Sequence, residues 1–300
     1  MTILGWTMTF FEFLYDVYIR ACNVQLEDDQ RITVERDLNN ENLFVFKEGF
    51  RRDYYVYGVY KTVPDTGIDC PSCFVLPYHD GLISSLHQLI DEKEESHVRL
   101  VDDHVYDCTP NIKPDINGKH FGIEIVTNCS STVTTTTQFY NCYCNGSGYF
   151  NITYKNMRDL ISSFSSVDFS VKFSSDEVKN IVKHFNKDSI VQNGKNSVFF
   201  RRCSNGKLYL ECCDGQHSYS VHTDCDIEED ILYIPLYIRI REFISVLKTC
   251  SGRGLIFEGK GFSNDSLDAY LKVIDEDDFA RYEYWFPFIP NSLGHFRLGI

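Results

Sequence analysis

The sequence predicts an α+β protein in which helices cover one face and antiparallel sheets form the other. Two observations predict this class. A unit of one strand, one helix and three strands occurs twice in the second half of the chain, and the same order of elements occurs twice more in the first half. Copies of one supersecondary unit at similar spacing are typical of a pseudo-symmetric domain. We therefore expect two similar domains, each made of two βαβββ units.

The two clearest units lie after residue 167. Each begins with an alternating apolar run, which is typical of a strand, and continues into a segment with helical periodicity. The first comprises DFSVKF (168–173), SSDEVKNIVKHF, NSVFFRRC, KLYLECC and HSYSVHTD. The second comprises ILYIPLYIRI (231–240), REFISVLKTC, RGLIFEGK, SLDAYLKVID and ARYEYWFPFIP.

The first half repeats the pattern less regularly. It begins with a helical segment, FFEFLYDVYIRAC, and a second helix is expected at DGLISSLHQLIDEKEE, with its apolar residues on one side. Strands are expected at NVQLED, RITVER, NLFVFKE, DYYVYGVYKTV, CFVLPYH, HVRLVDD, KHFGIEIVT and TVTTTTQFY. The segment between the halves is rich in Asn, Gly and Ser, a composition that suits a connector. We predict an N-terminal domain at 1–140, a connector at 141–166 and a C-terminal domain at 167–300.

Composition and charge limit the possible partners. The chain has 300 residues, of which 43% are hydrophobic and 15% aromatic, enough for packed cores. Its formal net charge of -14 argues against nucleic acid as a partner unless the basic residues gather on one surface. No apolar run approaches the length of a membrane span, so we expect no membrane partner.

The twelve cysteines and four N-glycosylation sequons raise the alternative of a secreted glycoprotein. The N-terminus favours the other interpretation, since it lacks a basic segment and places Glu12 and Asp16 inside its apolar stretch. We therefore interpret the cysteines as reduced core residues and the sequons as chance matches. The sequons are at Asn128, Asn145, Asn151 and Asn264.

Catalytic and metal motifs carry little signal. Cys70 and Cys73 have the spacing of zinc ligands, and Cys142 with Cys144 is a conceivable second pair, but the pairs lie far apart in the sequence. The chain has no dinucleotide-binding, P-loop, zinc-protease or nucleophile-elbow motif. We predict a binding protein without metal or cofactor, and not an enzyme.

Two helices of the second half are basic on one side. In the segment 174–187, the apolar stripe Val178, Ile181, Val182 and Phe185 has helical spacing. Lys179, Lys183 and Lys187 lie on the other side or just beyond the helix end. In the segment 241–250, Phe243, Ile244 and Leu247 form the stripe and leave Arg241 and Lys248 exposed.

Basic helix faces in an acidic chain favour a protein that meets DNA on one surface. The alternative is that these lysines are solvated and bind nothing specific, as most exposed lysines are. The two interpretations differ in whether the helices at 174–187 and 241–250 share one exposed face.

These segments resemble a sliding clamp of the proliferating cell nuclear antigen type. DFSVKFSSDEVKNIVKHFNK and NSVFFRRCSNGKLYLECCDG resemble the opening strand, helix and hairpin of that family's second domain. LYIRIREFISVLKTC resembles its next strand and helix, and YEYWFPFIP its last strand. The resemblance covers about 166–290, and the first half only in the order of its elements.

The resemblance implies a DNA-clamp fold and a function as DNA polymerase processivity factor. In that family a homo- or hetero-oligomeric ring surrounds duplex DNA, and the helices that line the inside of the ring face the DNA. The implied DNA-facing residues are Lys179, Lys183, Lys187, Arg241 and Lys248. Polymerases and other replication or repair proteins would dock short apolar peptides on the strip Trp285, Phe286, Pro287, Phe288 and Ile289, for which a core strand is the alternative interpretation.

Two departures keep other functions open. The helix at 80–95 is acidic and the N-terminal helix offers only Arg20, so a complete basic lining is in doubt. The connector segment NMRDLISSF reads as a helical turn or two, which resembles checkpoint clamp subunits, and a viral processivity factor is equally compatible. The alternatives are a checkpoint clamp subunit in a heterotrimer and a structural or interaction protein that binds no DNA. We expect the nucleus or a viral replication compartment as the location.

Overall fold

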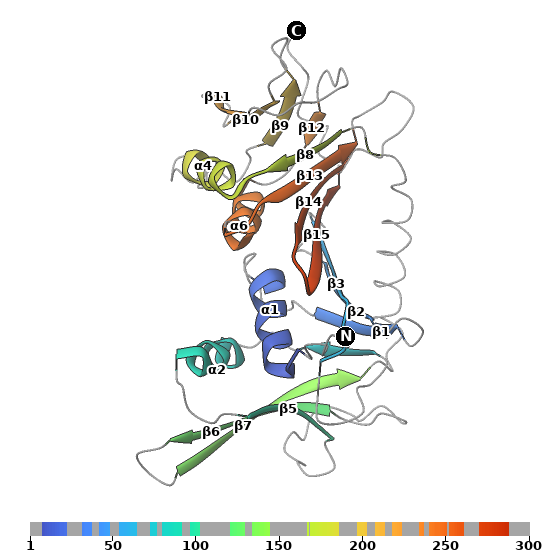
Figure 1. The fold of residues 1–300 in the computed structure, drawn as a ribbon, viewed down its shortest axis with the longest axis vertical. Coiled ribbons are helices and arrows are strands. Elements are labelled where there is room, and N and C mark those ends of the chain that lie inside the picture. Colours follow the sequence, from blue (N-terminus) through green and yellow to red (C-terminus); the bar gives the residue numbers. More distant parts are fainter. Residues whose placement is uncertain are drawn as a thin grey trace, which may run out of the picture. The chain divides into compact units, whose positions relative to one another are not determined.

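The structure is a computed structural model, and its helices and strands follow the order that the repeat predicts. It describes residues 8–22, 32–37, 42–48, 54–64, 73–76, 80–91, 97–102, 121–129, 134–144, 167, 169–185, 197–202, 208–213, 218–223, 234–236, 240–250, 252–260 and 270–287. Figure 1 shows the chain coloured from the N-terminus to the C-terminus.

The described elements form four consecutive repeats. In the first, an isolated β-bridge at Thr9 stands in place of the leading strand. It precedes α1 (Phe10–Cys22), β1 (Ile32–Asp37), β2 (Asn42–Glu48) and β3 (Tyr55–Tyr60). The second repeat is β4 (Cys73–Leu76), α2 (Asp80–Asp91), β5 (His97–Asp102), β6 (Phe121–Cys129) and β7 (Thr134–Cys144). The third is β8 (Phe169–Phe173), α4 (Ser175–Phe185), β9 (Ser197–Arg202), β10 (Leu208–Cys213) and β11 (Ser218–Thr223). The fourth is β12 (Ile234–Leu236), α6 (Ile240–Cys250), β13 (Leu255–Lys260), β14 (Tyr270–Glu276) and β15 (Ala280–Pro287).

The chain divides into two compact units, each built from two of these repeats. The first unit contains α1, β1, β2, the end of β3, β4, α2 and β5 to β7. The second contains β8 to β15 with α4 and α6, together with the first residues of β3. In the second unit the ring of Tyr54 lies 6.2 Å from that of Phe286.

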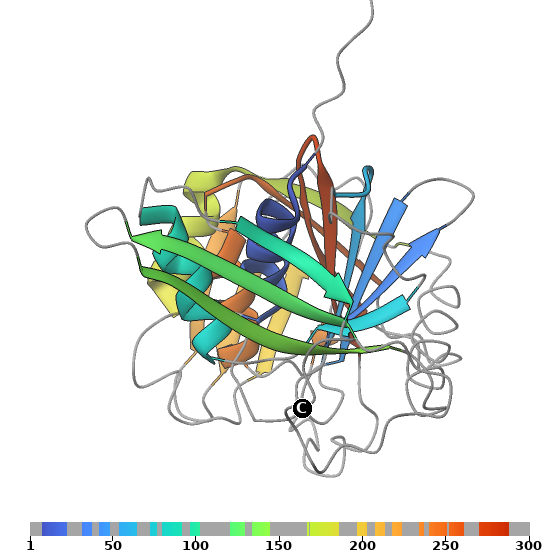
Figure 2. The same cartoon turned by 90° about the horizontal axis from the view of Figure 1, so that it is seen from below.

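Antiparallel pairing in the first unit joins its two repeats. Its strands lie in the order β5-β6-β7-β4-β1-β2-β3. β4, the leading strand of the second repeat, pairs with β1 of the first repeat through Val34 and Phe74. β6 and β7 form the long hairpin in the foreground of Figure 2.

The second unit repeats this exchange of strands. Here β12, the leading strand of the fourth repeat, pairs with β9 of the third, with Ile234 opposite Phe200. The order in one set of strands is β11-β10-β9-β12 and in the other β15-β14-β13-β8. The equivalent pairings β4 with β1 and β12 with β9 show that the two units have related topology.

Helices in each unit pack side by side on strands through apolar stripes. In the first unit α1 contacts α2 and β5, and buries Phe13, Leu14 and Val17 completely. In the second unit α4 contacts α6 (Figure 1). The rings of Phe243 in α6 and Phe257 in β13 lie 6.1 Å apart. Burial of these apolar side chains is the main favourable contribution to folding.

Most predicted elements are found, with local differences. The predicted strand 231–240 is shorter, because β12 covers only Ile234–Leu236 and α6 already begins at Ile240. The predicted strand NVQLED lies outside the described residues. β7 extends to Cys144, into the predicted connector, and residues 145–166 are not described. The predicted domain limits therefore stay a prediction. Among the described helices, none is long and apolar enough to cross a membrane.

Gly254 allows a close approach of two backbones at the start of β13. A Cβ atom at this position would lie 2.9 Å from the carbonyl oxygen of Phe173 in β8, whereas at Gly252 nothing lies within 4 Å. We expect Gly254→Ala to lower the free energy of unfolding by about 1–3 kcal/mol, because overpacking forces the backbones apart. Gly252→Ala is the matched control and should change it little. Thermal unfolding of both variants checks this; equal stability would contradict it.

Candidate nucleic-acid interface

The helix α4 begins with a reciprocal cap. The amide and hydroxyl of Ser174 both donate to Glu177 Oε2 at 2.7 Å, and the Glu177 amide donates to Ser174 Oγ at 3.3 Å. This is the capping box that the pattern S-x-x-E produces. It fixes where α4 begins and satisfies a backbone donor of its first turn.

One side of α4 is buried and the other carries the predicted lysines. Val178, Ile181 and Phe185 are fully buried, as predicted, whereas Val182 is half-buried. Lys179 and Lys183 are exposed and lie one helical turn apart. Lys187 lies outside the described residues. Two of the three lysines that this segment was predicted to offer to phosphates are therefore exposed to solvent.

α6 is arranged in the same way. Its residues Phe243, Ile244 and Leu247 are buried as predicted, and so is Val246. Lys248 is exposed in the last turn of the helix, where a cation also complements the helix dipole. The side chain of Arg241 is not described.

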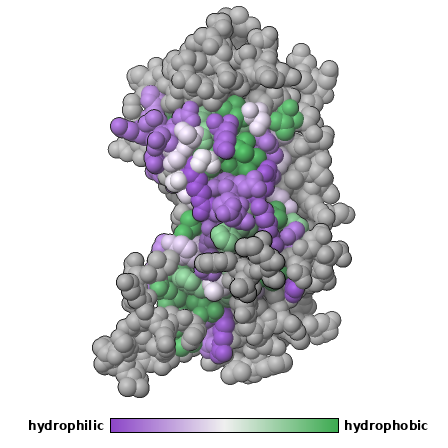
Figure 3. Space-filling view, viewed as in Figure 1, coloured by the Kyte–Doolittle hydropathy of each residue, from purple (hydrophilic) through white to green (hydrophobic). Residues whose placement is uncertain are grey.

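The two helices lie side by side in the second unit, as the DNA-binding interpretation requires. They contact each other (Figure 1), and each buries an apolar stripe on one side. Figure 3 shows hydrophilic surface over α4. The arrangement presents Lys179, Lys183 and Lys248 from neighbouring helices of a chain whose net charge is -14.

The helices of the first unit differ in chemistry although α1 has the same cap. The Thr9 amide donates to Glu12 Oε2 at 2.8 Å, and the Glu12 amide donates to Thr9 Oγ1 at 3.2 Å. On the outward side the rings of Phe11 and Tyr15 stack at 6.2 Å, and Tyr15 meets His87 of α2 edge-on at 5.6 Å. Figure 3 shows hydrophobic surface near α2. Among the described side chains of α1 and α2, no Lys or Arg is exposed.

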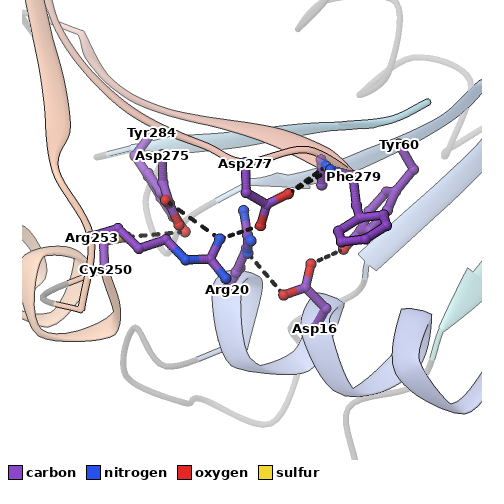
Figure 4. A network of polar contacts seen from close by, with 10 residues as sticks. Asp16, Arg20, Tyr60, Cys250, Arg253, Asp275, Asp277, Phe279 and Tyr284 are labelled. Carbon is purple, nitrogen blue, oxygen red and sulfur yellow. Dashed lines mark hydrogen bonds and ion pairs between the residues drawn. The ribbon is translucent and has the colours of Figure 1, made fainter. Parts of the chain in front are cut away.

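Arg20, the one basic residue that the N-terminal helix offers, is only 4% exposed. Its Nε donates to Asp16 Oδ1 at 2.9 Å, and the other oxygen of Asp16 accepts from the Tyr60 hydroxyl at 2.8 Å (Figure 4). Arg20 thus serves the interior of the first unit. Because Arg20 is buried, it adds no positive charge to the exposed side of α1.

Arg253, in the turn after α6, is engaged by carboxylates. It forms an ion pair with Asp277 and lies 4.0 Å from an oxygen of Asp275, and Asp277 also accepts from the amides of Phe279 and Ala280 (Figure 4). This arrangement ties the turn after α6 to the β14–β15 turn. We therefore leave Arg253 out of the candidate interface.

The predicted docking strip is partly in the interior. Phe286 is 1% exposed, with its ring 6.0 Å from that of Phe243. Trp285 is 3% exposed, donates to Glu283 at 3.0 Å and lies under the ammonium of Lys272. The side chain of Pro287 and residues 288 and 289 lie outside the described part. Docking on this strip stays a prediction.

Arg281 in β15 pairs with two carboxylates, Glu276 and Glu283, and Glu283 also accepts a hydrogen bond from Trp285. Burial works against its charged form, but hydrogen bonds and charges of Glu283 and Glu276 outweigh this and raise the pKa of the guanidinium. Both ion pairs measure 2.9 Å. Arg281 thus links β15 to the end of β14 through Glu276. Its other partner, Glu283, also holds Trp285 in place.

Comparison with known proteins finds similarity in structure and none in sequence. No protein-family profile and no curated protein matches the chain. The DNA polymerase III subunit beta of Borrelia burgdorferi superposes with a TM-score of 0.50 and 10% identity, over 93% of this chain and 63% of its own. A putative DNA polymerase III beta subunit of Eubacterium rectale gives 0.54 and 12%, over 97% and 68%. The beta sliding clamp of C. crescentus gives 0.52 and 9%, over 93% and 64%.

The chain has a DNA-clamp fold. The predicted fold class, with helices on one face and antiparallel sheets on the other, is confirmed. The matched clamps are bacterial, and the chain spans about two thirds of their length. At 9–12% identity the likeness extends to the fold alone.

Sequence reasoning missed the pairing of Asp176 with Lys179. Their Oδ1 and Nζ atoms lie 3.3 Å apart, on neighbouring turns of the exposed side of α4. The spacing of three residues is the signal that predicts such a pair.

The conceivable zinc ligands Cys70 and Cys73 cannot be compared with the structure, because Cys70 and the side chain of Cys73 lie outside the described residues. Elsewhere, the described residues contain no group of three metal-ligating side chains.

The Ser174 cap should stabilise α4 and with it the basic face. We expect Ser174→Ala to lower the free energy of unfolding by about 1 kcal/mol, because the Glu177 amide loses its acceptor. Asn180→Ala, at an exposed position of the same helix, is the control and should be neutral or slightly stabilising. Denaturant unfolding checks both variants. Equal effects would show that the cap does not matter.

Proposed function

We propose that the chain is a DNA sliding clamp and polymerase processivity factor of the proliferating cell nuclear antigen type. It would encircle or track duplex DNA and recruit replication or repair enzymes, and it would not itself be an enzyme. The clamp fold supports this proposal. Fold alone does not define function, so the proposal depends on the surface of the helices.

The observation that carries the proposal is that α4 and α6 contact each other and that each exposes lysines. Two neighbouring helices bury their apolar stripes and present Lys179, Lys183 and Lys248 outward, in a chain of net charge -14. Exposed lysines attract phosphates without reading bases. Such contact is weak and independent of sequence, which is what a protein that slides along DNA requires.

The proposal implies an oligomer, because a ring needs several copies or related subunits. Homo-oligomer and hetero-oligomer are both compatible, and the second corresponds to a checkpoint clamp subunit. The partners would be duplex DNA, DNA polymerase and other replication or repair proteins. We propose the nucleus or a viral replication compartment as the location, since a processivity factor acts where DNA is copied.

A second candidate is an interaction protein that binds no DNA. The first unit favours it, because the described side chains of α1 and α2 include no exposed Lys or Arg and show aromatic rings instead. Binding to DNA in solution separates the two functions.

Charge reversal on α4 and α6 tests the proposal. We expect Lys179→Glu, Lys183→Glu and Lys248→Glu together to weaken retention on duplex DNA with free ends, where phosphate contacts alone hold the protein. Each lost phosphate contact should flatten the log–log salt dependence by roughly one unit. The free energy of unfolding should change by no more than about 0.5 kcal/mol per exposed position. DNA retention measured over a range of salt concentrations checks this.

The control for charge is Lys172→Glu, compared with Lys183→Glu alone. Lys172 is exposed on β8, between the buried Val171 and Phe173, so its side chain leaves the sheet on the face away from the buried stripe. We expect only Lys183→Glu to weaken retention. If the triple variant keeps full retention at every salt concentration, the lysines are solvated surface and the interaction protein is favoured.

Peptide docking provides a separate prediction. We expect Pro287→Ala with Ile289→Ala to weaken binding of a short peptide rich in Leu and Phe, because the change removes two apolar side chains of the predicted strip. Phe279→Ala is the control, since Phe279 is 45% exposed at the β14–β15 turn. Fluorescence titration measures both affinities. Unchanged affinity in the double variant would count against docking at this strip.

A further inference from the structure

The exposed side of α4 carries a carboxylate that faces one of its lysines. Asp176 Oδ1 lies 3.3 Å from Lys179 Nζ, and the two side chains are 89% and 58% exposed. An ion pair this exposed is weak and exchanges readily with solvent. Lys179 is therefore available to a phosphate, but the phosphate must compete with Asp176 for it.

The start of α4 also carries negative charge. A helix N-terminus ordinarily attracts phosphate through its free amides and its dipole. Here Glu177 accepts from the amide and the hydroxyl of Ser174 at 2.7 Å, so a carboxylate already stands at this end. Asp176 adds a second negative charge one residue earlier. A phosphate that approaches α4 thus meets attraction at Lys183 and repulsion at the first turn.

We propose that Asp176 limits the strength of the DNA contact on this face. It competes with phosphate for Lys179 and repels phosphates that pass the first turn of α4. This inference rests on the proposed function, because it assigns to the proposed DNA-binding surface a residue that lowers the affinity for DNA. A clamp that slides benefits from such a residue, since each tight phosphate contact would have to break at every step.

Replacement of Asp176 by Asn removes the charge and keeps the size of the side chain. We expect Asp176→Asn to bind duplex DNA with free ends about two- to fivefold more tightly, which corresponds to the loss of one exposed ion pair. The log–log salt dependence should become steeper by up to about one unit, because Lys179 gains a phosphate contact. Fluorescence anisotropy between about 50 and 200 mM salt, where such contacts change affinity most visibly, measures both.

The matched control is Asp278→Asn, which makes the same change in net charge at an exposed position of the β14–β15 turn. We expect it to change the affinity by less than half as much as Asp176→Asn. A second test repeats Asp176→Asn in a Lys179→Gln background. The gain in affinity should shrink there, because the lysine for which Asp176 and phosphate compete is gone.

The outcomes separate this inference from the proposed function. If Asp176→Asn equals the wild type while the triple lysine variant loses DNA, the inference is wrong and the function stands. Equal gains from Asp176→Asn and Asp278→Asn would also overturn it, because the effect would then be one of net charge. If the wild type does not bind DNA at any salt concentration, the proposed function itself is wrong.

Discussion

The packing of Phe243 determines how the second unit presents its charges. Its ring lies 6.1 Å from that of Phe257 and 6.0 Å from that of Phe286, edge-on to both. Aromatic contacts of this geometry add to the burial of apolar area. Because a helix has 3.6 residues per turn, this contact fixes the rotation of α6 about its axis and leaves Lys248 exposed. α4 is held in the same way by Val178, Ile181 and Phe185.

Local charge matters more here than the charge of the whole chain. A net charge of -14 predicts repulsion from DNA at long range. At physiological salt, however, exposed charges more than about 8 Å apart are largely screened, so a phosphate near α4 responds mainly to Lys179, Lys183 and the carboxylates beside them. The described outward side chains of α1 and α2 offer no comparable cations. If the chain binds DNA, the second unit supplies much of the attraction.

Periodicity predicted the helices and their buried sides because it depends only on nearby residues. The stripes of α4 and α6 follow this rule, with Val182 half-buried as the exception. Burial that depends on distant partners could not be predicted. Arg20 is buried because Asp16 pairs with it, while Tyr60, far along the sequence, holds Asp16. The same holds for Trp285, whose surroundings include Lys272 of the neighbouring strand.

The most direct measurement tests whether the chain stays on DNA by topology. A duplex tethered at one end is incubated with the protein, its free end is then blocked with a bulky protein, and the duplex is finally cut near the block. We expect the chain to remain bound through a high-salt wash while the end is blocked and to leave when the duplex is cut, because phosphate contacts alone are lost in high salt. Release by the wash before the cut, or retention after it, would contradict the account.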